Sequence, residues 1–118
     1  MNYLLVFIGG GLGCLCRYLV SVYTLRMFSG AFPLGTFISN VFSCLILVAG
    51  FGIFMNSGLD KNLVKAGLII GFCGGFSTFS TFSFETVELI KNGNHMVAAG
   101  NVILSVSICL ILLYKLTK

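Results

Sequence analysis

Residues 71–85 read G-F-C-G-G-F-S-T-F-S-T-F-S-F-E and lie inside a long apolar segment. Hydroxyl side chains and phenylalanines are interleaved along it: Ser77, Thr78, Ser80, Thr81 and Ser83 with Phe76, Phe79, Phe82 and Phe84. Polar groups without a partner are costly on a lipid-facing surface. The pattern therefore predicts that this stretch faces protein or a polar passage inside a membrane.

The composition around this stretch indicates an integral membrane protein. Of the 118 residues, 58% are hydrophobic and 8% are charged, and the mean hydropathy is +1.07. Soluble domains carry roughly 25% charged residues, and a membrane span needs about 20 apolar ones. Four such stretches are present, at residues 3–23, 33–55, 63–85 or slightly beyond, and 96–114. We expect residues 1–118 to form a single all-α domain of four transmembrane helices, the first being a retained helix rather than a signal peptide.

Glycines indicate where these helices pack and where one of them breaks. Gly9 and Gly13 have the G-x-x-x-G spacing that lets helix backbones approach closely, and residues 67, 71 and 75 form a similar glycine face on the third span. Gly74 and Gly75 lie just before Ser77 and Thr78 in the sequence and weaken the helix. Broken helices are tolerated in mid-membrane where freed carbonyls face protein, ions or water. We expect the third helix to be broken there, at a possible ion site.

Polar side chains also form stripes on the neighbouring helices. Thr36, Asn40 and Ser43 recur at helical spacing on the second span. A second stripe follows on the last span: Asn101, Ser105 and Cys109. Each stripe suits either interhelical hydrogen bonding or the lining of a pore. Arg17, in the first helix, similarly suits a water-facing role or a structural one in which it holds loop carbonyls or reaches the headgroups.

The phenylalanines of the third span point to the kind of ion that would pass. Helical spacing places Phe76, Phe79 and Phe82 on one stripe beside the hydroxyl side chains. An aromatic ring has a partly positive edge, so ring edges together with hydroxyl donors suit a small, hard anion and suit a cation poorly. The alternative is that these phenylalanines are ordinary packing or lipid-facing residues.

The basic residues are spread almost evenly over the two sides of the membrane. The side with both termini carries Lys61, Lys65, Lys115 and Lys118, and the other carries Arg26 and Lys91, with Arg17 deeper in the first helix. Lys and Arg in loops set the orientation of a membrane protein. So small a bias predicts insertion in both orientations and an antiparallel pair.

Catalytic and metal-binding motifs are absent from the sequence. The five cysteines all fall within the predicted spans, which argues against a disulfide framework or a zinc site, and they are best explained as small apolar fillers: Cys14, Cys16, Cys44, Cys73 and Cys109. With one histidine and three acidic residues, and without a recognisable catalytic motif, the chain is not expected to be an enzyme.

Three segments carry a resemblance to a known family. They are G-G-G-L-G-C-L-C-R-Y at residues 9–18, P-L-G-T-F-I-S-N at 33–40, and the signature at 71–85. With these segments the chain resembles the fluoride channel family known as Fluc or CrcB over nearly its whole length. Two positions depart from the family pattern: Ser77 stands where threonine is common, and Asn101 stands where an aromatic hydroxyl is expected, so Asn101 is left out of the pore.

The resemblance implies a fluoride-selective channel that passively exports fluoride from the bacterial cytoplasm, in the plasma (inner) membrane. It implies an antiparallel, dual-topology homodimer with two pores and a structural sodium ion at the interface. Sodium would be held by backbone carbonyls of Gly74 and Ser77. The implied fluoride pore residues are Phe79, Phe82, Asn40, Ser80, Thr81 and Ser105. The expected partners are fluoride, a second copy of the chain and membrane lipid, and not nucleic acid.

Two other functions fit a small four-helix membrane protein. A small multidrug-type antiporter exchanges protons for aromatic cations and needs a carboxylate deep in the membrane, whereas the acids here are Asp60 in a loop and Glu85 and Glu88 at the end of a span. A non-transporting assembly subunit would use the polar stripes only to hold helices together.

Overall fold

The structure is a computed structural model that describes residues 2–56, 58 and 60–116. The described residues form α1 (Asn2–Met27), α2 (Leu34–Asn56), the π-helix η1 (Leu63–Cys73), α3 (Gly74–Phe76), α4 (Phe79–Lys91) and α5 (His95–Leu116). Four segments are long and apolar enough to cross a membrane: α1, most of α2, the run from η1 to α4, and α5. The predicted all-helical, four-span architecture is confirmed, although the first and third spans run past their predicted ends to Met27 and Lys91.

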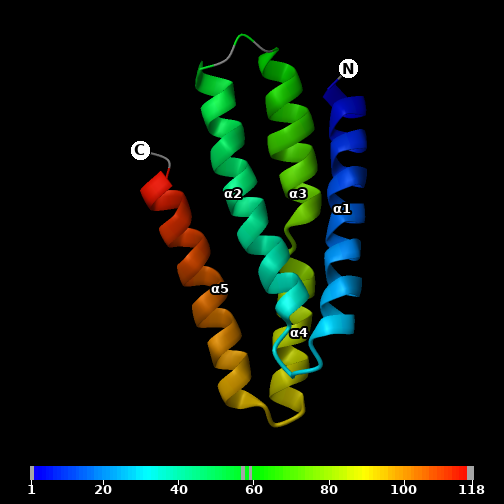
Figure 1. Cartoon of the computed structure of the whole chain (residues 1–118), viewed down its shortest axis with the longest axis vertical. Coiled ribbons are helices and arrows are strands. Elements are labelled where there is room, and N and C mark those ends of the chain that lie inside the picture. Colours follow the sequence, from blue (N-terminus) through cyan, green and yellow to red (C-terminus); the bar gives the residue numbers. More distant parts are fainter. Residues whose placement is uncertain (1, 57, 59, 117–118) are drawn as a thin grey trace.

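The helices run up and down along the long axis of the molecule (Figure 1). α1 begins and α5 ends at the same end, and the α1–α2 and α4–α5 connections lie at the other. The longest dimension is 51 Å, against about 30 Å for the hydrocarbon core of a bilayer. The helices are therefore long enough to cross the bilayer and extend into both headgroup regions.

The charged residues lie towards the two ends of this bundle. Lys65, near the start of η1, and Lys115, in the last turn of α5, lie towards one end, while Arg26 in the last turn of α1 and Lys91 at the end of α4 lie towards the other. Lys118 lies outside the described residues. The even spread of charge expected from the sequence is thus present in the fold.

α1 packs against η1 and α3 through backbone-to-backbone contacts made possible by glycine. A Cβ added to Gly9 would collide with the carbonyl oxygen of Gly67, and one added to Gly13 with that of Phe72. A Cβ at Gly75 would collide with the carbonyl oxygen of Gly10. The predicted packing role of these glycines is confirmed.

Helical structure stops at Phe76 and resumes at Phe79. Ser77 has ψ 157° and Thr78 has φ −153° and ψ 124°, both extended. The prediction placed the break at Gly74 to Ser77; of these residues Ser77 is extended, whereas Gly74 and Gly75 are helical in α3. The close approach of α1 is what requires a glycine at Gly75.

The extended residues also correct the predicted stripe of three phenylalanines. Phe76 ends α3, whereas Phe79 and Phe82 belong to α4, and the two residues between them do not continue the helical rotation. Phe76 is buried in the bundle, and Phe79 is 79% exposed. Only Phe79 and Phe82 remain as a pair.

The polar stripe on α2 faces the inside of the bundle. Thr36 and Ser43 are buried and Asn40 is half-buried, as the spacing predicted. Ser39, which the prediction did not include, is fully buried, and its hydroxyl has no hydrogen-bond partner among the described residues. The inner face of α2 is therefore unusually polar for a membrane helix.

Candidate functional site

Side chains of α2 and of the interrupted residues themselves bond to the backbone where the helix is interrupted. The Thr78 N–H donates to Asn40 Oδ1 at 2.9 Å, and Thr78 Oγ1 caps α4 by accepting the Thr81 N–H at 3.2 Å. The Ser77 hydroxyl donates to the carbonyl of Cys73 at 2.8 Å, and Ser43 Oγ donates to the same oxygen at 3.0 Å. The extended pair is thus a stable feature held by α2 and not a loose segment.

This arrangement releases the carbonyl groups just before the interruption. In a continuous helix the Gly74 oxygen would accept the Thr78 N–H, which is instead given to Asn40. The Gly75 oxygen accepts a hydrogen bond from Arg17 Nε at 3.1 Å. Arg17 therefore has the structural role that the sequence left open, since it holds a freed carbonyl.

The surroundings of Gly74 are open on the side where a Cβ would stand. Gly74 is exposed, and a Cβ added to it would meet nothing within 4 Å. Carbonyl oxygens are suitable ligands for a hard cation. No group of three or more His, Cys, Asp or Glu side chains that could hold a metal ion occurs among the described residues. The predicted sodium ligands, the backbone carbonyls of Gly74 and Ser77, are of the ligand type that suits a hard cation.

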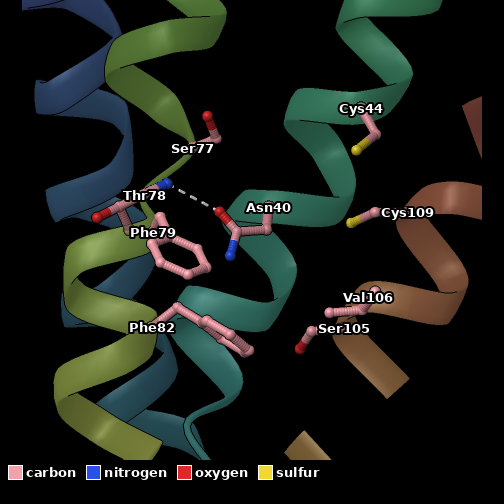
Figure 2. Close-up of a pocket in the computed structure, with 9 residues that line it drawn as sticks. All are labelled: Asn40, Cys44, Ser77, Thr78, Phe79, Phe82, Ser105, Val106 and Cys109. Carbon is pink, nitrogen blue, oxygen red and sulfur yellow. Dashed lines mark hydrogen bonds between the residues drawn. The ribbon is translucent and has the colours of Figure 1, made fainter. Parts of the chain in front are cut away.

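An open pocket of about 250 Å³ lies beside the interruption, between α2, α4 and α5 (Figure 2). Its walls are mostly apolar, with a few polar atoms directed into it. It is lined by Asn40, Cys44, Ser77, Thr78, Phe79, Phe82, Ser105, Val106 and Cys109. Four of the six predicted pore residues are thus brought together: Asn40, Phe79, Phe82 and Ser105.

The amide of Asn40 is oriented by its bond to the backbone. Because Oδ1 accepts the Thr78 N–H, Nδ2 is turned to the other side, and Figure 2 shows it directed away from Thr78 towards the level of Phe82. An amide nitrogen carries two donor hydrogens. The site therefore presents N–H donors, which can solvate an anion.

Two aromatic rings stand beside these donors. The ring centroids of Phe79 and Phe82 are 6.0 Å apart and the planes are tilted by 41°. Phe82 is buried at 9% exposure, whereas Phe79 projects from the surface of the subunit. Tilted rings direct partly positive edges into the space around them, which adds to the preference for negative charge.

A chain of hydrogen bonds ties α5 to α4 on the same side of the pocket. Ser105 Oγ donates to Asn101 Oδ1 at 3.2 Å, and Asn101 Nδ2 donates to Thr86 Oγ1 at 3.0 Å. Thr86 in turn donates to the Phe82 carbonyl at 2.8 Å. Asn101 thus acts in interhelical hydrogen bonding, while Ser105 both joins this chain and lines the pocket.

The remaining predicted residues lie next to the pocket without lining it. Ser80 is exposed, with its hydroxyl 3.3 Å from that of Thr78, and Thr81 gives its N–H to the helix cap. Lining residues absent from the predicted set of pore residues are Cys44, Ser77 as a side chain, Thr78, Val106 and Cys109. Of these, Cys109 belonged to the polar stripe for which pore lining was left open. Helical spacing was the available signal, because Cys44 follows Asn40 and Cys109 follows Ser105 by one turn.

A smaller pocket of about 100 Å³ lies near the α1–α2 connection. Ser21, Thr24 and Thr36 contribute to its lining together with Glu85. The Oε1 atom of Glu85 is buried and has no hydrogen-bond partner among the described residues. Among the acidic groups of the described residues, it comes nearest to the buried carboxylate that a proton-coupled antiporter would need.

Comparison with known proteins separates these functions. A family model described as "CrcB-like protein, Camphor Resistance (CrcB)" matches residues 4–115. A protein of Geotalea daltonii named fluoride-specific ion channel FluC is 43% identical over 112 residues, which cover 90% of this chain and 87% of that protein. Proteins of the same name from Coxiella burnetii and Shewanella sp. (strain ANA-3) are 45% and 38% identical, covering 93% and 96% of this chain and 90% of each relative.

These relatives are ion channels and not enzymes, as expected for this chain. Their name does not favour the antiporter alternative. The resemblance noted in the three sequence segments is confirmed over nearly the full length of the chain. The four spans and the channel family together make this a multi-pass membrane protein.

Proposed function

Because the chain belongs to the CrcB-like family, we propose that it is a fluoride-selective channel through which fluoride leaves the cytoplasm passively. The observation that carries the proposal is the Asn40 amide, whose oxygen is fixed on the Thr78 N–H so that its nitrogen is directed away from Thr78 on the pocket wall. Selective pores replace the hydration shell of an ion with ligands of their own. For fluoride these ligands are hydrogen-bond donors and ring edges.

The fluoride path passes Asn40, Phe82 and Phe79. Ser105 contributes a hydroxyl from α5, and Ser80 and Thr81 contribute hydrogen-bonding groups at the start of α4. The exposed ring of Phe79 needs a second surface opposite it, because an ion cannot be stripped of water against lipid on one side. A partner subunit supplies that surface, which leads to an assembly with two pores.

The assembly is an antiparallel homodimer of subunits inserted in both orientations in the bacterial inner membrane. The nearly even distribution of Lys and Arg over the two ends supports this. The interruption at Ser77 and Thr78 lies in mid-membrane, and the Gly74 carbonyl faces the two-fold axis. There the Gly74 and Ser77 carbonyls of both subunits hold a structural sodium ion, which offsets the cost of unpaired backbone acceptors in a dry interface.

Fluoride efflux from liposomes, followed with a fluoride electrode, tests the function. Asn40→Asp keeps an oxygen acceptor for the Thr78 N–H but replaces the N–H donors with negative charge. A carboxylate about 4 Å from fluoride opposes it by about 4 kcal/mol at an effective dielectric constant of about 20, so efflux should fall by more than about a hundredfold. Efflux from Asn40→Asp at the parent rate would refute the assigned path. Absence of efflux from the parent would instead favour the assembly-subunit reading, and proton-coupled drug uptake would favour the antiporter.

The phenylalanine pair has a matched control on its own helix. Phe79→Ile and Phe82→Ile keep bulk but remove the ring edge, and each should strongly reduce efflux. Phe84 is also exposed on α4, at 66%, and does not line the pocket, so Phe84→Ile should conduct like the parent. Efflux at the parent rate from all three variants would show that the rings serve packing alone.

Labelling of an added loop cysteine tests the orientation. After replacement of the five native cysteines by Ala or Ser, an impermeant thiol reagent should modify about half of the molecules from either side if both orientations are equally populated. Modification from one side only would exclude dual insertion.

For the sodium ion, replacing Na⁺ with a large organic cation should weaken the dimer in cross-linking experiments, and an unchanged dimer would argue against the site.

A further inference from the structure

Two cysteines face the same pocket from opposite helices. Cys44 on α2 and Cys109 on α5 both line it, and Figure 2 shows their side chains in the space between these helices, above Ser105. Both cysteines are free. Each lies one turn from a proposed pore residue, Asn40 and Ser105 respectively. A pair of thiols therefore stands on the wall of the proposed fluoride path.

The chemistry of this pair favours one class of ligand. Thiolate sulfur is a soft ligand that selects soft metal ions. Zinc sites in proteins need four ligands, or three and a water molecule, and no cluster of three or more His, Cys, Asp or Glu side chains is present in the described part of the chain. Two facing thiols suit a metal ion that prefers linear two-coordinate geometry, such as Hg²⁺.

The complex formed when Hg²⁺ binds to the two thiols suits the apolar walls of the pocket. When Hg²⁺ binds, two S–H bonds break, two S–Hg bonds form and two protons leave for water, with no change in oxidation state. The resulting bis-thiolate complex carries no net charge. A neutral complex avoids the large cost of placing an ion in an apolar environment, which fits the mostly apolar walls of the pocket.

We propose that Cys44 and Cys109 form a two-coordinate site for soft metal cations on the pocket wall, and that a metal bound there closes the ion path. The blocking part of this proposal rests on the proposed channel function, whereas the binding part does not. A metal linking α2 to α5 occupies the pocket between Asn40 and Ser105. It also ties the two helices together, so that an ion cannot pass between them.

Metal binding is measured first, without reference to fluoride. The full-length protein in detergent is titrated with mercuric chloride, and the ultraviolet absorbance of mercury–thiolate bonds is followed. A monothiol, 2-mercaptoethanol, is then added to strip the metal. Two tethered ligands act at an effective concentration of about millimolar or more. The parent should therefore retain Hg²⁺ at monothiol concentrations at least about tenfold higher than a chain with either cysteine replaced.

The test variant and its control each lack two thiols. Cys44→Ser with Cys109→Ser should lose the monothiol-resistant metal, and so should each single replacement. Cys14→Ser with Cys16→Ser, on α1 and away from the pocket lining, should keep it. Zn²⁺ in place of Hg²⁺ should bind none of these chains at comparable strength. Resistant mercury in the Cys44/Cys109 variant, or its loss from the Cys14/Cys16 variant, would overturn the assignment.

Fluoride efflux from liposomes then tests closure. Each variant is compared with itself, with and without mercuric chloride, and a dithiol is added at the end to reverse the effect. The parent and the Cys14/Cys16 variant should lose at least about nine-tenths of their efflux when one metal occupies each pocket, since an occupied narrow path does not conduct. Resistant mercury binding without loss of efflux would overturn closure. An absence of efflux before mercury is added would refute the channel function, and the absorbance titration would still decide the metal site.

Discussion

The tight packing of α1 against the third span predicts a sharp difference between two glycines on one helix. Gly13 and Gly11 both lie in the middle of α1. A Cβ at Gly13 would collide with the Phe72 carbonyl oxygen and lie 2.8 Å from the Phe76 nitrogen, whereas a Cβ at Gly11 would meet nothing within 4 Å. We expect Gly13→Ala to destabilise the fold and Gly11→Ala to leave it nearly unchanged.

The magnitude follows from what the added methyl group touches. The atoms opposite Gly13 are backbone, so no side-chain rotation relieves the overlap, and α1 must move away from η1 and α3. Overpacking of this kind typically costs about 1–3 kcal/mol. In water, replacing glycine by alanine in a helix gains up to about 1 kcal/mol. In a membrane or detergent the separated helices of the unfolded state are already helical. The helix propensity of alanine then stabilises the folded and unfolded states equally, so this gain should largely cancel.

Unfolding in mixed micelles, driven by a rising fraction of denaturing detergent and followed by circular dichroism, measures both variants against the parent. We expect Gly13→Ala to lose about 1–3 kcal/mol and Gly11→Ala to stay within about 0.5 kcal/mol of the parent, as surface substitutions usually do. Equal stability of the two variants would refute the argument. It would mean that the α1–α3 contact is loose enough to accept a methyl group.

Three further predictions concern the interruption in the third span. Thr78→Val removes the α4 cap and should destabilise the protein by about 1 kcal/mol in the same unfolding assay, and a stability equal to that of the parent would show that the cap is not needed. Arg17→Gln shortens the side chain that holds the Gly75 carbonyl and should lower the free energy of unfolding by about 1–3 kcal/mol. An unchanged free energy of unfolding would favour a water-facing role for Arg17. Ser77→Thr keeps the hydroxyl that donates to Cys73 and leaves the backbone carbonyl in place, so fluoride efflux and dimer cross-linking should match the parent, and a loss of either would mean that the side chain itself is a ligand.

Much of the candidate site followed from residue type and helical spacing. Asn40 and Ser43 recur on one face of α2, and Ser105 and Cys109 on one face of α5, so each polar face was predictable before the helices were placed. Phe79 and Phe82 share a face of α4 for the same reason. Periodicity cannot say which faces meet, because any two polar faces could pair. Cys44 was therefore interpreted only as a filler, and for Cys109, on the stripe with Asn101 and Ser105, pore lining and helix packing both stayed open.

The sequence by itself determined the number of spans, the all-helical class, the glycine contacts and the family, because apolar length, close-packing spacing and a long signature are properties of the linear chain. The tertiary structure alone decided where the third span is interrupted. Glycine propensity pointed to Gly74 and Gly75, but α1 packs over Gly75 and keeps it helical, while Asn40 takes the Thr78 N–H away from the helix. The location of the interruption depends on partners from α1 and α2, remote in sequence, and local propensity contains no information about them.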